Sequence, residues 1–153
     1  MTPSGMIASA TPNQKRLSRL YEMLINEKKT LESVAGLISD HTLRCTVLSL
    51  AQQANQYATE LSCYLRTPVS LAKRTAKAVL AATPAVMDEA GIIHFCRLQE
   101  QRLVNAYQRF IKEVPFYEDL NAMVSYQLNG LRAAGLQLKL LGSLHRSPVA
   151  PLA

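Results

Sequence analysis

Two carboxylates in this chain of 153 residues stand where helical spacing calls for apolar side chains, and they are the residues best suited to chemistry. Glu27 falls within a stripe of leucines that includes Leu24 and Leu31. Glu100 follows Cys96 by one turn on a second stripe. Carboxylate oxygens are hard ligands that suit iron or manganese, and helical bundles bind such metals between facing helices. The first question is therefore whether these glutamates belong to a metal centre.

The remaining ligands of such a centre are missing from the sequence. A dinuclear carboxylate site takes one Glu from each of two helices and a Glu-x-x-His pair from each of the other two. Gln53 and Gln56 stand where the second helix would need such a pair, and Gln127 and Gly130 stand there in the last helix. The chain has no Asp or Glu after Asp119, so we expect no metal and no cofactor.

Glu60 and the three histidines do not fill the gap. Glu60 lies about two turns from the middle of its helix, roughly 10 Å along the axis, which is too far to share a metal. His41 and His94 fall near helix starts, and His145 falls near the chain end. None of them is paired with a Glu at metal-binding spacing, and we assign no catalytic residue.

Two positions of Glu27 remain open. It could turn to the edge of its stripe, beside Lys28 and Lys29, with its carboxylate in water. A buried Glu27 would instead have to find hydrogen-bond donors or take up a proton. Possible donors on the facing helices are Gln53, Gln127, Tyr57 and Tyr126. For the buried case we predict a polar core layer near the middle of the bundle that sets helix register; it consists of Glu27, Gln53, Glu100 and Gln127.

Helix signals dominate the chain that must position these residues. Thr-Pro pairs at 11–12, 67–68 and 83–84 each precede a periodic stretch, as expected of a capping Thr followed by Pro at the first helical position. Apolar periodicity predicts four helices, over residues 12–39, 41–66, 83–113 and 118–142, with Asp40 capping the second. We expect one domain over residues 12–142, with flexible tails at 1–11 and 143–153.

Four similar amphipathic helices predict an all-α four-helix bundle. The first two and the last two are joined by short connections, whereas the second and third are far apart in sequence. A long crossover there makes the second and third helices parallel, which is the ferritin-like arrangement. Residues 68–82 of the crossover predict a short helix with a basic side, a candidate anion-binding patch formed by Lys73, Arg74 and Lys77. We expect this helix to lie across its own bundle with its charges in water.

Two stretches carry a family resemblance, "LYEMLINEKKTLESVAGLISDHTLRCTVLSLAQQANQYATEL" and "EQRLVNAYQRFIKEVPFYEDLNAMVSYQLNGLRAAGLQLKLL". A mid-helix Glu, an A-x-x-x-x-x-E-L helix end and a later A-Y pair resemble ferritin-like four-helix-bundle proteins of unknown function. The matching positions are Ala54, Glu60, Leu61, Ala106 and Tyr107. The resemblance spans roughly residues 20–141 and implies the bundle fold, but it implies little about activity because that family has no established function.

The charge and the cysteine content limit which partners and which compartment are expected. The net charge of +6 favours an anionic partner or serves solubility alone, and because the basic residues are dispersed we do not expect nucleic acid. Three cysteines, Cys45, Cys63 and Cys96, lack a C-x-x-C spacing and fall among apolar neighbours in predicted helices, so we expect buried thiols in a reducing, cytoplasmic compartment. No stretch of about 18 apolar residues exists, so we expect no membrane insertion, and the start does not resemble a secretory signal.

The last two helices carry more apolar residues than one buried stripe requires. Adjacent apolar pairs such as Ile92-Ile93 and Phe110-Ile111, together with Leu136 and Leu140, imply a second contact surface and a two-fold homodimer. We therefore expect a non-enzymatic, oligomeric interaction or stress-associated protein with no identifiable small-molecule ligand. The alternatives are a metal-binding ferritin relative that uses Glu27 and Glu100, or a weak anion or nucleic-acid binder that uses the basic crossover.

Overall fold

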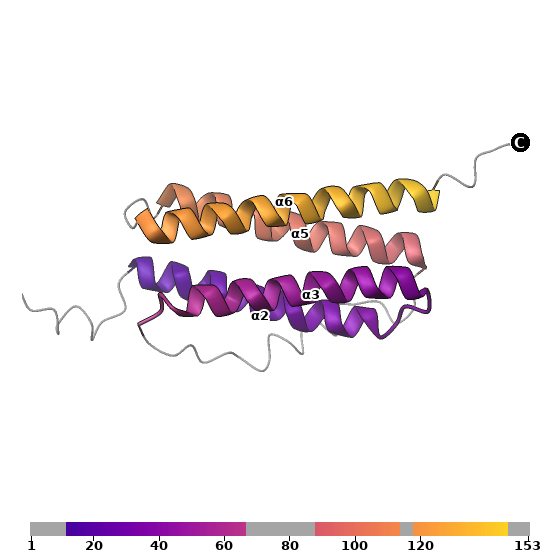
Figure 1. The fold of residues 1–153 in the computed structure, drawn as a ribbon, viewed down its shortest axis with the longest axis horizontal. Helices are drawn as coiled ribbons and strands as arrows, with labels where there is room; N and C mark the ends of the chain where they lie inside the picture. Colours follow the sequence, from indigo (N-terminus) through magenta and orange to yellow (C-terminus); the bar gives the residue numbers. More distant parts are fainter. Residues whose placement is uncertain (1–11, 67–87, 114–117, 147–153) are drawn as a thin grey trace, which may run out of the picture.

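The computed structural model describes residues 12–66, 88–113 and 118–146 of the chain. These residues form four α-helices and no strand, in agreement with the predicted all-α four-helix bundle. The helices are α2 (Pro12–Ala35), α3 (His41–Ser62), α5 (Glu89–Glu113) and α6 (Glu118–Arg146). α2 and α3 form one hairpin and α5 and α6 form the other, and the two hairpins lie one above the other as two layers (Figure 1).

Contacts at one end of the bundle fix the helix directions. Near the start of α2, Gln14 hydrogen-bonds to the carbonyl of Tyr64 and to the amide of Arg66, just beyond α3. Arg16 of α2 forms a 3.1 Å ion pair with Glu113, the last residue of α5. The ends of α3 and α5 therefore lie together, and these two helices run parallel (Figure 1).

α3 ends and α5 begins at opposite ends of the bundle, in agreement with the parallel order that the sequence predicted for these two helices. The predicted crossover helix at 68–82 and its basic residues Lys73, Arg74 and Lys77 lie outside the described residues.

Four helix boundaries differ from the predicted ones, one in each helix. α2 ends at Ala35, beyond which the amides of Leu37 and Ile38 bond three residues back, to the carbonyls of Val34 and Ala35, in place of the helical four. α3 ends at Ser62 rather than at 66, and the peptides beyond it bond to α2 instead. α5 begins at Glu89 rather than near 83, since the non-helical Asp88 caps it by accepting a 2.8 Å bond from the amide of Gly91.

The predicted cap of α3 is confirmed. Asp40 has an extended backbone, and its side chain accepts a 2.8 Å hydrogen bond from the amide of Leu43. This bond satisfies one of the orphan donors at the helix start. At the other end of the chain, α6 continues past Gly142 to Arg146.

The hydrophobic core consists of two clusters along the bundle axis. One lies toward the start of α2 and is centred on Leu20, Leu61, Leu103 and Val124. The other lies toward the end of α2 and includes Val34, Val47, Cys96 and Leu138. Between them, α2, α3 and α5 each contribute a polar residue that is part of neither apolar cluster, namely Glu27, Gln53 and Glu100. The bundle therefore has a polar break near its middle, and this break positions the candidate site.

None of the four described helices has a stretch that is apolar and long enough to span a lipid bilayer.

Candidate functional site

The polar break contains the two glutamates that the sequence singled out. Glu27 is 4% exposed and Glu100 is 2% exposed, so the alternative in which Glu27 sits at the bundle edge in water is wrong. Each lies between a residue of the first cluster and a residue of the second on its own helix. α2 and α5 pack against each other, which brings the two carboxyl groups together across the interface between the hairpins.

The two carboxyl groups share one hydrogen bond and compete for charge. Burial raises the pKa of Glu27 well above its usual range, and the neighbouring Glu100 raises it further, against a small opposing effect of Arg102. Burial raises the pKa of Glu100 to about 7, an effect that the hydrogen bond from Glu27 partly opposes. Near neutral pH the two carboxyl groups therefore share a proton and titrate as a pair. One oxygen of each carboxyl group, Oε2 of Glu27 and Oε1 of Glu100, is buried without a hydrogen-bond partner.

Gln127 lies in a different set of contacts, between α6, α3 and α5. Its side chain is fully buried, and its Oε1 accepts a 2.5 Å hydrogen bond from the hydroxyl of Tyr107. Its Nε2 donates to Oε1 of Glu60 at 2.9 Å and to the carbonyl of Tyr57 at 3.3 Å. Burial raises the pKa of Tyr107, so the phenol keeps its proton and remains a donor. The amide is thus held between a fixed donor and a fixed acceptor, which also fixes its orientation.

Gln53 contacts neither the Glu27–Glu100 pair nor Gln127 through a hydrogen bond of its side chain. Its Nε2 donates to the Tyr57 hydroxyl and to the carbonyl of Gly130, each at 3.4 Å, while its Oε1 is buried without a partner. The predicted polar core layer is therefore staggered. On α6, Gly130 faces Gln53, and Gln127 lies about one turn further toward the end of α3. The amides that were candidate donors for Glu27 are directed at α3, α5 and α6 groups instead.

Glu60 and Tyr107 were not assigned to the polar layer from the sequence. Glu60 was set aside because of its distance from the helix centre, but the stagger of α6 brings Gln127 to it. Tyr107 reads as one more apolar residue of its stripe. A buried phenol needs a hydrogen-bond partner, and that requirement was the available signal for pairing it with a polar residue on the facing helix.

The donor set does not fit the metal centre of ferritin-like bundles. Within the described ranges no three His, Cys, Asp or Glu side chains come together in a way that could hold a metal ion. The carboxyl groups that do meet number two, and the position that would supply a further ligand from α6 is occupied by Gln127, which is bonded to Tyr107 and Glu60. The alternative that assigns Glu27 and Glu100 to a metal site therefore lacks its remaining ligands.

The interior also lacks an activated nucleophile among the groups described. Burial, with smaller effects of Glu27 and Glu100, raises the pKa of the Cys96 thiol to about 12. A thiol with this pKa stays protonated near neutral pH, and the thiolate is the reactive form. The buried polar side chains bond mainly to one another and to backbone carbonyls.

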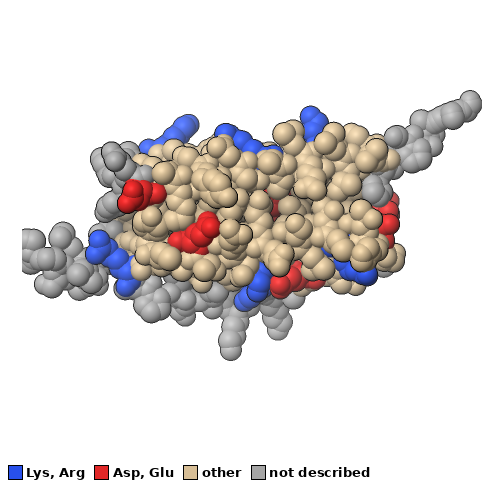
Figure 2. All heavy atoms as spheres, in the orientation of Figure 1, with Lys and Arg blue, Asp and Glu red and all other residues tan. Residues whose placement is uncertain are grey.

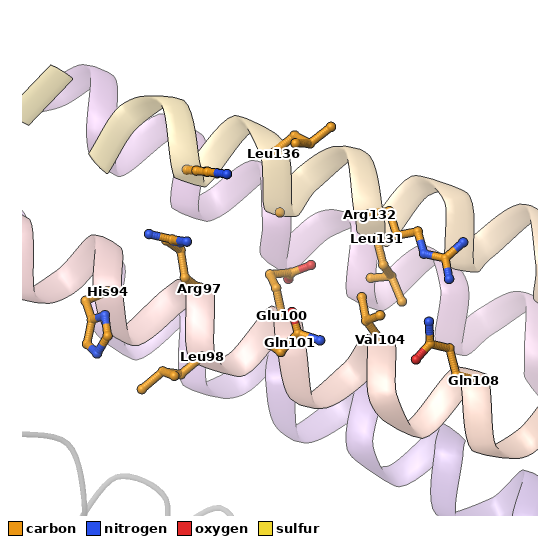
Figure 3. Close-up of a pocket in the computed structure, with 12 residues that line it drawn as sticks. His94, Arg97, Leu98, Glu100, Gln101, Val104, Gln108, Leu131, Arg132 and Leu136 are labelled. Carbon is orange, nitrogen blue, oxygen red and sulfur yellow. The ribbon is translucent and has the colours of Figure 1, made fainter. Parts of the chain in front are cut away.

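The largest described groove lies between α5 and α6 and reaches the interior at Glu100. It has a volume of about 680 Å³, and its walls combine leucines with basic side chains. Figure 3 shows Arg97 and Arg132 on opposite helices of this groove, with Glu100 between α5 and α6. The groove gives the chain a concave surface with a mixed apolar and cationic lining, which is the usual character of a recognition site.

Comparison of the chain with protein-family models, with curated proteins and with solved structures gave no match, so neither the ferritin-like resemblance nor any activity receives support from a relative.

Proposed function

We propose that this chain is a non-enzymatic, ferritin-like helical bundle that binds other protein chains and that its first partner is a second copy of itself. The contact surface in this proposal is an uncharged strip along α6, made of exposed residues that face away from the core. The strip consists of Tyr126, Asn129, Ala133, Leu136, Leu140 and Leu144.

One observation supports the proposal above all others. Leu136, Leu140 and Leu144 follow each other at one-turn spacing, and their exposed fractions are 62%, 67% and 67%. Single exposed leucines are ordinary on protein surfaces, but three in a row along one helix form a contiguous apolar patch. Leu136 and Leu140 are among the residues from which the sequence predicted a second contact surface. Ile92, Ile93 and Phe110 were used for the same prediction, but they are buried in the core of the bundle itself.

The lack of charge in the strip favours a second copy as the partner. In a two-fold interface each residue meets the same surface on the other subunit, so like charges would oppose one another. The strip has no Lys, Arg, Asp or Glu, and Figure 2 shows the C-terminal half of α6 with few charged side chains on this face. The cations of this part of α6, Arg132 and Lys139, line the groove on its other side.

Light scattering coupled to size-exclusion chromatography tests the dimer. We expect the mass of a dimer at micromolar concentration for the natural chain and the mass of a monomer for Leu140→Ser/Leu144→Ser. The matched control is Leu48→Ser, which removes an exposed leucine of α3 outside the strip and should leave the dimer intact. A natural chain that remains monomeric at these concentrations would contradict the proposal.

We also place the protein in a reducing compartment, such as the cytoplasm. All three cysteines are free thiols, but the predicted burial is right for Cys96 alone and wrong for Cys45 and Cys63, which are exposed. Exposed free thiols persist where glutathione and thioredoxin keep them reduced. Labelling of Cys45 and Cys63 by a thiol reagent in intact cells should therefore be complete, and conversion of either thiol to a disulfide would contradict this placement.

A further inference from the structure

The groove between α5 and α6 lies beside the uncharged strip but has the opposite character. Val104 and Leu131 line its buried part, and Leu98 and Leu136, each more than half exposed, stand at its sides. Arg97, Arg132 and Lys139 line it as well. An apolar floor with cations around it is the complement of an amphipathic anion.

The cations of the groove are not neutralised within the described structure. The ion pairs there join Arg16 to Glu113 and Lys28 to Glu32, so none involves a groove cation. Glu100 is the single carboxyl group that lines the groove, and it is buried against Glu27. The groove therefore presents an uncompensated positive potential to an incoming chain (Figure 3).

The shape of the groove favours an extended occupant. Its lining runs along α5 from His94 to Gln108, which corresponds to about 21 Å at 1.5 Å per residue. A helix of four turns has this length, and the side chains of one helix face can fill a shallow groove. Arg132 and Lys139 are seven residues apart on α6, about two helical turns, so they can contact carboxylates two turns apart on a partner.

We propose that the α5–α6 groove binds an acidic amphipathic helix of another protein. Leucines of that helix pack between Leu98 and Leu136, and its carboxylates pair with Arg97, Arg132 and Lys139 on either side. The groove and the uncharged strip are adjacent surfaces that share Leu136, whereas Leu140 and Leu144 belong to the strip alone and do not line the groove.

The occupant must come from a different chain. The parts of this chain outside the described residues, at 1–11, 67–87, 114–117 and 147–153, contain no Asp or Glu at all. On a second copy, Glu22 and Glu32 of α2 alternate with lysines and arginines. The other acidic residues outside the core lie mostly at helix ends, as Asp88, Glu89, Glu113, Glu118 and Asp119 do, and form no acidic face along a helix. Neither source supplies the carboxylates that the groove requires.

Fluorescence anisotropy with designed peptides tests the proposal. The probe is a labelled 18-residue helical peptide with leucines on one face and glutamates flanking them at two-turn spacing. We expect saturable binding that weakens as salt rises, and at least a tenfold loss of affinity for Arg132→Glu/Lys139→Glu. The matched control, Lys15→Glu/Lys29→Glu, changes net charge equally on exposed positions of α2 and should bind the peptide as the natural chain does.

Several results would overturn the inference. One is equal binding of a peptide whose glutamates are replaced by lysine, and another is equal loss in the Lys15 and Lys29 control. Tight binding of a leucine-free acidic peptide or of a short RNA duplex would assign the groove to polyanions in general. The variant Leu140→Ser/Leu144→Ser should be monomeric yet bind the peptide normally, so failure of the dimer and failure of the groove are separate outcomes.

Discussion

The interior of the bundle contains two sets of polar residues that differ in how fully they are hydrogen-bonded. The Gln127 network joins α3, α5 and α6 through donors and acceptors that match: the Tyr107 hydroxyl donates a hydrogen bond to the amide oxygen, and Glu60 accepts one from the amide nitrogen. The Glu27–Glu100 pair joins α2 to α5 with one shared hydrogen bond and leaves an oxygen of each carboxyl group buried without a partner.

The difference shows which polar groups stabilise the bundle and which cost stability. A buried hydrogen bond with both partners satisfied contributes a little, and removing one partner costs more because the other is left unpaired. A buried carboxyl pair costs desolvation, which a single hydrogen bond does not fully offset. We therefore expect loss of Gln127 to destabilise the protein and loss of the carboxyl pair to stabilise it.

The largest effect should come from breaking the Gln127 network. Gln127→Leu removes the hydrogen bond and leaves the buried Tyr107 hydroxyl without an acceptor, for a loss of about 3 kcal/mol in the free energy of unfolding. Urea denaturation followed by circular dichroism measures it. The double variant Gln127→Leu/Tyr107→Phe should lose clearly less than the sum of its two single variants, because the phenol is removed with its partner. Additive losses would mean that the two side chains do not act together.

The next largest effect is a dependence of the free energy of unfolding on pH, which arises from the Glu27–Glu100 pair. Glu100 has a pKa of about 7 in the folded chain against 4.5 for an ordinary Glu, so between pH 4.5 and 7 the folded state holds a proton that the unfolded state has released. The contribution of Glu100 to stability is complete below pH 4.5 and is lost as pH rises through 7. We expect a decrease of about 2 kcal/mol over this window, less than the roughly 3 kcal/mol of a fully buried group, because Glu100 borders the groove. The raised pKa of Glu27 extends the decrease to higher pH.

Urea denaturation at pH 4.5, 6, 7 and 8 checks this dependence. Its control is Glu27→Leu/Glu100→Leu, in which the decrease should disappear. Stability that rises from pH 4.5 to 7 in the natural chain would show that the pair is ionised in the fold.

The same double variant tests the cost of the carboxyl pair directly. Leucines of similar volume at positions 27 and 100 leave no orphaned oxygen, so the free energy of unfolding at pH 8 should rise by about 1 to 2 kcal/mol. Glu27→Leu alone should gain less at this pH, because Glu100 then loses the donor that stabilises its charge. Thermal melting at pH 8 ranks the three proteins, and a double variant that melts below the natural chain would reverse our view of the pair.

Much of this architecture follows from the sequence. Apolar periodicity predicts the four helices, and Asp40 predicts where α3 begins. The long connection between the second and third helices predicts that these two run parallel. The inward position of Glu27 on its leucine stripe made burial one of two possibilities. Burial and the pairing with Glu100 could be decided only once the packing of α2 against α5 was known.

The stagger of α6 could not be predicted, because helical periodicity sets which face is buried but leaves sliding along the axis free. One turn of sliding keeps the buried face of α6 the same while it exchanges Gln127 for Gly130 opposite Gln53. Three-dimensional packing resolves the choice through Tyr57, whose ring occupies the space beside Gly130. The Gln127 network is a consequence of that one contact.

A substitution at Gly130 tests whether Tyr57 fixes the position of α6 along the bundle axis, and it should have the smallest effect of the series. A Cβ atom at this position would overlap the Tyr57 hydroxyl and lie 3.1 Å from Cζ, both in a ring that is buried. Overpacking of this kind costs about 1 to 3 kcal/mol, and the better helix propensity of Ala returns up to about 1 kcal/mol, so Gly130→Ala should lose about 1 kcal/mol. Gly135→Ala is the matched control, since nothing lies within 4 Å of its Cβ position, and it should gain a few tenths of a kcal/mol to about 1 kcal/mol. Gly130→Ala/Tyr57→Phe removes the overlapping hydroxyl and should recover part of the loss. If Gly130→Ala were as stable as Gly135→Ala in urea denaturation, Tyr57 would not fix the position of α6, and the register of the Gln127 network would need another cause.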